Sequence, residues 1–123
     1  MDVATRNDFR ADLGPARTHP DDRLVVEVSP PAAAVGTVTV RGEVDVATAP
    51  TLRRRLDTLL AEGIHDLDLD LTDVPFIDVA GLSLLLRVQS QLSSRGGRLT
   101  LLRPCCSLEI MSAALGVRFP STG

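Results

Sequence analysis

The stretch FIDVAGLSLLL, Phe76 to Leu86, holds the residues with the clearest chemical potential in the sequence. Asp78 stands where a leucine-rich helix is expected to begin, and its carboxylate can accept hydrogen bonds from the N–H groups of Ala80 or Gly81. The amides and the dipole of a first helical turn favour negative charge, so a phosphate would be well placed there. A hydroxyl in that turn would be a sensible phosphoacceptor, but Val79 and Ala80 carry none. The sequence therefore keeps an anion-friendly helix start and lacks a group to phosphorylate.

A second candidate for chemistry is the segment HDLDLDLTDV, in which aspartates alternate with leucines. Asp66, Asp68 and Asp70 offer the oxygen ligands that hard cations prefer. On one face of a strand, however, neighbouring side chains lie about 6.6 Å apart, twice the rise per residue, so three of them cannot converge on one ion. The alternation instead predicts a strand with a buried leucine face and a solvated aspartate face. We expect no metal site and no cofactor.

Catalytic arrangements are also weak elsewhere in the chain. His19 and His65 are the two histidines, and neither has a Ser or Cys in a recognisable nucleophile setting. The chain has no glycine-rich loop of the P-loop or dinucleotide type. Cys105 and Cys106 lie at the expected start of the last helix, where a redox sensor is one interpretation and small, partly buried residues are the other. We expect a binding protein rather than an enzyme.

Length and composition limit the remaining functions. A chain of 123 residues fits one domain. Its net charge of −3 and its lack of Trp and Tyr argue against nucleic acid or an anionic membrane surface as a partner. No apolar run approaches the ~20 residues of a membrane span, so direct membrane insertion is not expected. Two adjacent cysteines cannot frame a disulfide-stapled fold, which favours a reducing, cytoplasmic setting. The oligomeric state is left open.

The strands that must position these residues are indicated by hydrophobic alternation. Residues 1–23 mix charged residues with Pro, Gly and Ala without periodicity and are predicted to form a flexible N-terminal tail. Strands are expected over 24–28, 37–45, 65–74 and 98–104. A turn region is predicted over 29–36, because Pro30 and Pro31 do not suit a sheet interior.

Three helices are expected between and after these strands. The first carries an apolar stripe that includes Leu52 and Leu56, with Thr48 as its cap, Pro50 in its first turn and Gly63 at its end. Its cluster of three arginines is either a solvated helix face or a patch that docks a partner; these are Arg53, Arg54 and Arg55. The second helix starts at Asp78 and stops at two glycines, Gly96 and Gly97. The last helix has a core stripe of three residues and stops at Gly116; the stripe is Leu108, Met111 and Leu115.

The element order is therefore β-β-α-β-α-β-α, with a short edge strand as an optional last element. Strands that alternate with helices favour a partly parallel sheet with right-handed crossovers, and the first two strands add an antiparallel pair. The polar aspartate face indicates that helices cover only one side, because a strand buried on both sides would be apolar throughout. The predicted fold class is α/β, a single domain with a small mixed sheet and helices packed mainly on one face.

Three segments in this order resemble a known family. GEVDVATAPTLRRRL, then LDLTDVPFIDVAGLSLLL, then RLTLLRP followed by a helix that ends in LGV, are similar to a STAS domain of the anti-sigma factor antagonist type. The resemblance covers roughly residues 24 to 119, and assigns 24–123 to a STAS domain. It implies a protein of bacterial partner switching and transcription regulation: the unphosphorylated antagonist binds an anti-sigma factor, often a serine kinase, and frees a sigma factor.

The sequence departs from this family at one position of the motif. The family motif typically reads Asp-Ser-Ser-Gly-Leu or Asp-Ser-Thr-Gly-Leu, with the phosphoacceptor directly before the Gly, and here that position is Ala80. Three consequences are open. The protein is a permanently unphosphorylated antagonist, or a neighbouring hydroxyl of Ser83 or Thr72 substitutes, or the domain is an accessory subunit of a lipid or ABC-type transport complex.

The resemblance and the loop positions together predict a partner-binding surface. Loops at strand ends are where α/β sheets usually place their sites. The expected residues come from two loops and the start of the second helix: Asp45, Thr72, Asp78, Val79, Ala80, Gly81 and Ser83. Purely structural roles are the alternatives, namely capping for Asp45 and Asp78, close packing for Gly81 and an ordinary helix surface for Ser83.

Overall fold

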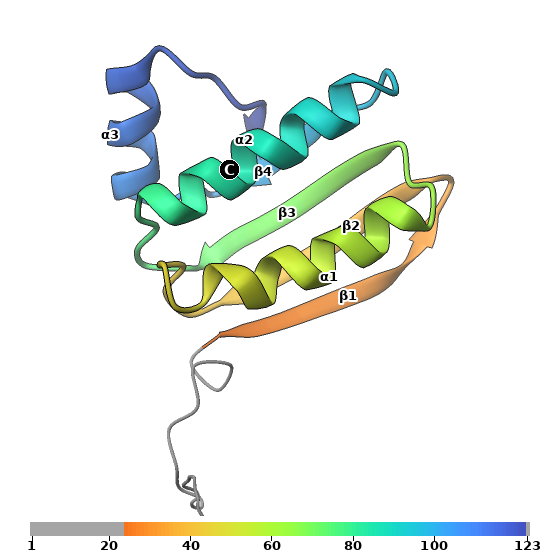
Figure 1. Ribbon diagram of the computed structural model, residues 1–123, viewed down its shortest axis with the longest axis horizontal. Coiled ribbons are helices and arrows are strands. Elements are labelled where there is room, and N and C mark those ends of the chain that lie inside the picture. The colour runs from red at the N-terminus through yellow and green to blue at the C-terminus, as the bar shows by residue number, and fades with distance from the viewer. Residues whose placement is uncertain (1–23, 123) are drawn as a thin grey trace, which may run out of the picture.

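Eight elements build the part of the chain that can be described. The computed structural model describes residues 24–122, so the predicted tail over 1–23 lies outside the described residues. The elements follow in the order β-β-α-β-α-β-α-β, which includes the optional last strand. Their bounds are β1 Val25–Ala32, β2 Val35–Arg41, α1 Ala49–Ala61, β3 Asp66–Asp73, α2 Val79–Ser93, β4 Leu99–Leu102, α3 Cys106–Leu115 and β5 Ser121–Thr122 (Figure 1).

The strands of the described residues form one mixed sheet in the order β1-β2-β3-β4-β5. β1 and β2 make an antiparallel hairpin, whereas β2 to β5 pair in parallel with their neighbours. A helix connects each parallel pair, as a crossover between parallel strands requires. Because parallel strands point the same way, the loops that enter α1, α2 and α3 all start at one edge of the sheet.

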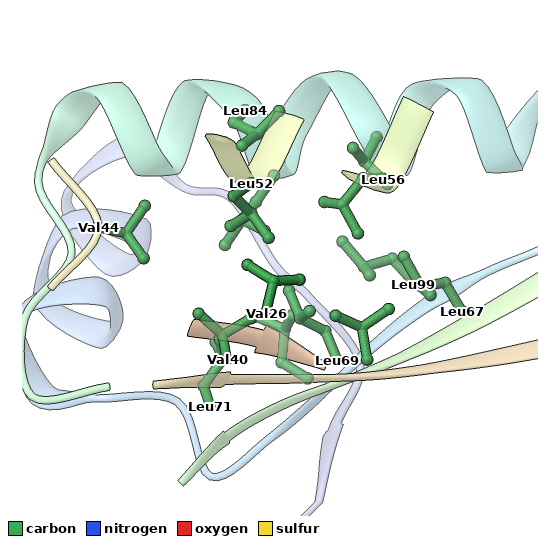
Figure 2. Close-up of a cluster of buried hydrophobic side chains, with 14 of the residues drawn as sticks. Val26, Val40, Val44, Leu52, Leu56, Leu67, Leu69, Leu71, Leu84 and Leu99 are labelled. Atoms are coloured by element: carbon green, nitrogen blue, oxygen red, sulfur yellow. The ribbon is translucent and has the colours of Figure 1, made fainter. Parts of the chain in front are cut away.

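The sheet is covered by helices on one side, as predicted. Leu67, Leu69 and Leu71 of β3 are almost fully buried, while Asp68 on the same strand is exposed. α1 and α2 lie over the apolar face, and the α1 leucines Leu52 and Leu56 point toward it (Figure 2). Burying one such leucine stabilises the fold by roughly 1.5–3 kcal/mol.

The predicted turn over 29–36 is wrong in its extent. β1 continues through Pro30 and Pro31 to Ala32, and the turn is confined to Ala33 and Ala34. β1 is an edge strand, and its register shifts between Ser29 and Ala32, so two residues without N–H donors are tolerated there. Ala33 and Ala34 both have positive φ angles, 54° and 63°. A tight hairpin requires this conformation, but its usual signal, Asn-Gly, is absent from the sequence.

The helix ends follow the predicted stop signals, but one predicted core residue is exposed. Gly63 after α1 and Gly116 after α3 adopt left-handed φ angles of 85° and 69°. In α3, Leu108 is buried and Met111 is half-buried, whereas Leu115 is 64% exposed, so burial decreases along the helix. Within residues 24–122 the longest helix, α2, has 15 residues, and none has both the length and the apolar composition of a membrane span.

Candidate functional site

Asp78 caps helix α2 as the sequence predicts. Its backbone is extended, with φ −97° and ψ −169°, and its Oδ1 accepts hydrogen bonds from the N–H groups of Ala80 at 2.8 Å and Gly81 at 3.2 Å. Two of the N–H groups that a helix start leaves without helical partners are thereby satisfied. The capping role is thus present, and a role of Asp78 in partner binding stays a prediction.

The three residues after Asp78 have different environments. Val79 is 67% exposed, Ala80 is half-buried, and Gly81 is buried. A Cβ atom on Gly81 would lie 2.5 Å from Cγ2 of Ile77 and 2.9 Å from Cγ1 of Val44. Gly81 is therefore required for close packing of α2 against two loops, which is the structural alternative that the sequence left open. Val79 and the Ala80 methyl remain at the surface.

Asp45 makes a matching turn in the neighbouring loop. Its Oδ1 accepts hydrogen bonds from the N–H groups of Ala47 at 2.9 Å and Thr48 at 3.0 Å. Thr48 occupies the N-cap position of α1, as predicted, but the expected side-chain cap is wrong, because its hydroxyl bonds to none of the helix N–H groups. Its buried hydroxyl instead donates to the carbonyl of Glu43 at 2.7 Å and accepts from the N–H of Asp45 at 3.0 Å. Thr48 thus holds the preceding loop closed.

Backbone hydrogen bonds join this loop to the one that precedes α2. The N–H of Val44 donates to the carbonyl of Phe76 at 3.0 Å, and the N–H of Asp78 donates to the carbonyl of Val44 at 3.0 Å. Val44 itself points into the core (Figure 2). The starts of α1 and α2 therefore lie side by side at the same edge of the sheet (Figure 1). The structure brings Asp45 and Asp78 into one pair of connected loops.

Ser107 fixes the backbone next to Asp78, and this role was not predicted from the sequence. Its Oγ accepts from the N–H of Ile77 at 3.1 Å and donates to the carbonyl of Ile77 at 3.1 Å, which ties the first turn of α3 to the residue before Asp78. Cys105 Sγ lies 3.4 Å from the same hydroxyl. Thirty positions separate Ser107 from Ile77, and no spacing rule in the sequence links them.

An apolar surface and a groove lie beside these loops. Val46, Phe76 and Val79 are large hydrophobic residues with exposed side chains, and Val46 is 76% exposed. A groove of about 300 Å³ runs between the first turns of α1 and α2. Residues of both helices and of the loop before α1 line it: Val46, Ala49, Pro50, Arg53, Ala80, Ser83, Leu84 and Arg87. The structure thus brings Ser83 together with Ala80.

Thr72 lies on the other side of the sheet. It follows the buried Leu71, so its side chain shares the polar face with Asp70, whereas α2 covers the apolar face. Both the hydroxyl and the N–H of Thr72 donate to Oδ1 of Asp70, the latter at 2.9 Å. The hydroxyl bond first, and then the backbone bond, lower the pKa of Asp70 below its ordinary value, with a smaller effect from Arg103. The structure therefore does not bring Thr72 together with Ser83.

Side chains that could bind a metal ion do not cluster in the part of the chain that the structure describes. Among residues 24–122, no three His, Cys, Asp or Glu side chains come together as possible ligands of a metal ion. This part of the molecule presents exposed aliphatic side chains, a capped helix start and a groove with two arginines, which suit binding of a partner.

The mixed sheet with its two connected loops is the fold of a known domain family. The chain belongs to the STAS domain family, whose family model matches residues 23–119. The family resemblance of the three sequence segments is thereby confirmed.

Particular relatives carry more specific names. The chain is 38% identical over 64 residues to the anti-sigma-B factor antagonist of Bacillus subtilis (strain 168), a match that spans 52% of this chain and 58% of that relative. A crystal structure of an anti-sigma factor antagonist from Mycobacterium paratuberculosis is similar with a TM-score of 0.67 at 27% identity, over 81% of this chain and 86% of that chain. The anti-sigma factor antagonist SpoIIAA in its unphosphorylated form has the same fold, with a TM-score of 0.66 at 18% identity over 80% and 88% of the two chains.

Proposed function

We propose that this protein is an anti-sigma factor antagonist of a bacterial partner-switching system, and that it binds its anti-sigma factor without control by phosphorylation at the usual site. The observation that carries the proposal is the start of α2. Asp78 caps the helix through the N–H groups of Ala80 and Gly81. In this proposal Ala80 takes the motif position that the family resemblance gives to the phosphoacceptor, and its methyl group cannot be phosphorylated. The names of the similar antagonists from Bacillus subtilis and Mycobacterium paratuberculosis support the same role.

In this proposal the surface acts by binding and not by catalysis. Val79, Ala80 and Ser83 contact the partner, and Asp45, Asp78 and Gly81 hold the two loops in place. The partner is an anti-sigma factor of the serine kinase type, and the complex forms in the cytoplasm, where sigma factors act. An uncharged, half-buried Ala80 keeps this surface permanently competent, because no phosphate can form there to repel the partner.

The experiment is affinity capture from a lysate of the host, with the unmodified chain and an Ala80→Glu variant as baits. Mass spectrometry of the bound proteins should identify an anti-sigma factor with the unmodified chain, in the presence of ATP, and at least tenfold less of it with the variant, because the added carboxylate imitates a phosphate. Ala61→Glu adds the same charge at an exposed position at the far end of α1 and should bind normally.

Two outcomes would count against this proposal. Recovery of a transport permease or ATPase in place of an anti-sigma factor would assign the domain to a transport complex. A phosphate on Ser83 or Thr72 in the spectrum of the bait would show that a substitute residue is modified, and would contradict the permanent competence of the surface. An Ala80→Ser variant adds a positive test, because an active anti-sigma kinase with ATP should phosphorylate it if the motif frame is intact.

A further inference from the structure

The groove between α1 and α2 carries charges that the capped helix start does not explain. Arg53 comes from the first half of α1 and Arg87 from α2, and both line the groove next to aliphatic side chains. The lining, which is drawn from the described residues, contains no carboxylate. The groove therefore joins two positive charges to an apolar lining, on a chain whose net charge is −3.

The carboxylate of Asp57 contacts both arginines. Asp57 Oδ1 accepts a hydrogen bond from Nη1 of Arg87 at 3.1 Å, and its Oδ2 lies 3.7 Å from Nε of Arg53. Two guanidinium groups against one carboxylate leave a local charge of about +1, and a guanidinium has five N–H donors, more than Asp57 can accept. The pair is thus held across the groove with donors to spare.

We propose that this groove binds an acidic and aliphatic segment of the partner, in which a carboxylate bonds to Arg53 and Arg87 and a neighbouring aliphatic side chain packs on Val46 and Leu84. The proposal rests on the proposed function and names the chemistry of the anti-sigma factor's contact. Charge complementarity selects the carboxylate, since a bidentate arginine contact gives direction as well as attraction. The aliphatic part is selected by the exposed Val46 and the apolar floor of the groove.

Paired variants test this contact directly. The dissociation constant of the captured anti-sigma factor is measured by calorimetry with the full chain. Arg53→Gln and Arg87→Gln should each raise it about tenfold, because each removes one charge from a contact that excludes water. Arg55→Gln is the matched control: Arg55 is exposed on the same helix and does not line the groove, so the constant should stay within about twofold. Unchanged affinity in both groove variants would overturn the proposal.

An opposite-sign variant separates recognition from stability. Asp57→Asn removes the carboxylate that competes for both arginines, so the dissociation constant should fall about threefold even though an ion pair within the fold is lost. If Asp57, Arg53 and Arg87 had only a structural role, the dissociation constant of Asp57→Asn would rise or stay the same. Raising salt from about 0.1 M to about 1 M, which shortens the Debye length from about 10 Å to about 3 Å, should weaken the unmodified complex more than the Arg87→Gln complex.

The failure of this proposal can be distinguished from failure of the proposed function. If Ala80→Glu abolishes capture while the arginine variants bind normally, the antagonist role stands and the groove contact is overturned. If no anti-sigma factor is captured, the groove is tested with a synthetic helical peptide of Leu and Glu against the isotope-labelled full chain. Chemical shifts of Val46, Ser83 and Arg87 should move with this peptide and not with a Leu and Lys peptide. No shift with either peptide would overturn the proposal.

Discussion

Two aspartates, Asp45 and Asp78, make the same local motif in the loops that follow the neighbouring strands β2 and β3. Their surroundings give them different roles. Each accepts hydrogen bonds from the N–H groups two and three residues further along the chain. The buried hydroxyl of Thr48 bonds to the N–H of Asp45 and to the carbonyl of Glu43, which closes the Asp45 turn. Helix α1 starts after it, at Ala49. The turn of Asp78 leads directly into α2.

The same aspartate turn thus supports a loop at Asp45 and presents the proposed binding surface at Asp78. The side chains of Asp45 and Thr48 make hydrogen bonds to residues of their own loop, Glu43 to Thr48. The Asp78 cap fixes only the helix start, and leaves Val79 exposed and Ala80 half-buried next to the groove. Backbone hydrogen bonds from Val44 to Phe76 and from Asp78 to Val44 join the two loops. We therefore expect changes at the shared packing to cost stability, and changes at the presented surface to cost binding.

The largest effect on stability should come from Gly81→Ala, which attacks the packing that both loops share. The added Cβ would lie 2.5 Å from Cγ2 of Ile77 and 2.9 Å from Cγ1 of Val44. Both are methyl groups on buried β-branched side chains, so the loops must shift, and we expect a loss of about 2 kcal/mol despite the better helix propensity of Ala. Urea denaturation measures it. An unchanged free energy of unfolding would mean that the loops yield easily and are not a rigid unit.

A somewhat smaller loss is expected for Thr48→Val, which keeps the side chain's shape and removes the hydroxyl. The carbonyl of Glu43 and the N–H of Asp45 would lose their partner in a buried place, at a cost of about 1.5 kcal/mol. Thr48→Ser retains the hydroxyl and should lose about half as much, from the missing methyl group. Thermal unfolding of the three proteins gives the order. If Ser is as damaging as Val, the hydroxyl is not what closes this loop.

The direct comparison of the two aspartates uses Asp45→Ala and Asp78→Ala. Each removes an acceptor for two N–H groups, so each should cost about 1 kcal/mol of stability. Only Asp78→Ala should also loosen the first turn of α2 that carries Ala80, and it should weaken anti-sigma factor binding by more than Asp45→Ala does. Asp78→Asn keeps an acceptor and serves as the control. Equal losses of binding from both alanine variants would make Asp45 part of the contact itself.

The sequence predicts the local part of this architecture well and the long-range part poorly. The Asp78 cap and the leucine face of β3 depend on neighbours within a few residues, and both are confirmed. The hydroxyl of Thr48 bonds to the preceding loop and not to the helix, because a Thr before a helix can do either and the sequence does not distinguish them. Ser107 was missed, since its partner Ile77 lies on another element. The two loops meet only because parallel strands align their ends, which no local pattern encodes.

The smallest expected effect concerns Thr72, on the opposite face of the sheet from the proposed surface. Thr72→Val removes the hydroxyl bond to Asp70 and keeps the backbone bond, so the pKa of Asp70 should rise part of the way to its ordinary value. A lowered pKa in the folded state stabilises the protein above the unfolded pKa of about 3.9, and this stabilisation disappears as the pH falls through the folded value. The stability difference between the variant and the unmodified chain should therefore be present at neutral pH and vanish in acid.

That stability difference should be at most about 0.3 kcal/mol, because Asp70 and Thr72 face solvent and water screens their interaction. A carboxyl-carbon NMR titration of Asp70 is the sensitive measurement. Anti-sigma factor affinity should be the same for both proteins, since the Thr72 hydroxyl is held on the face that α2 does not cover. Weaker binding by Thr72→Val would extend the contact around the edge of the sheet, and would return Thr72 to the partner-binding surface that the sequence predicted.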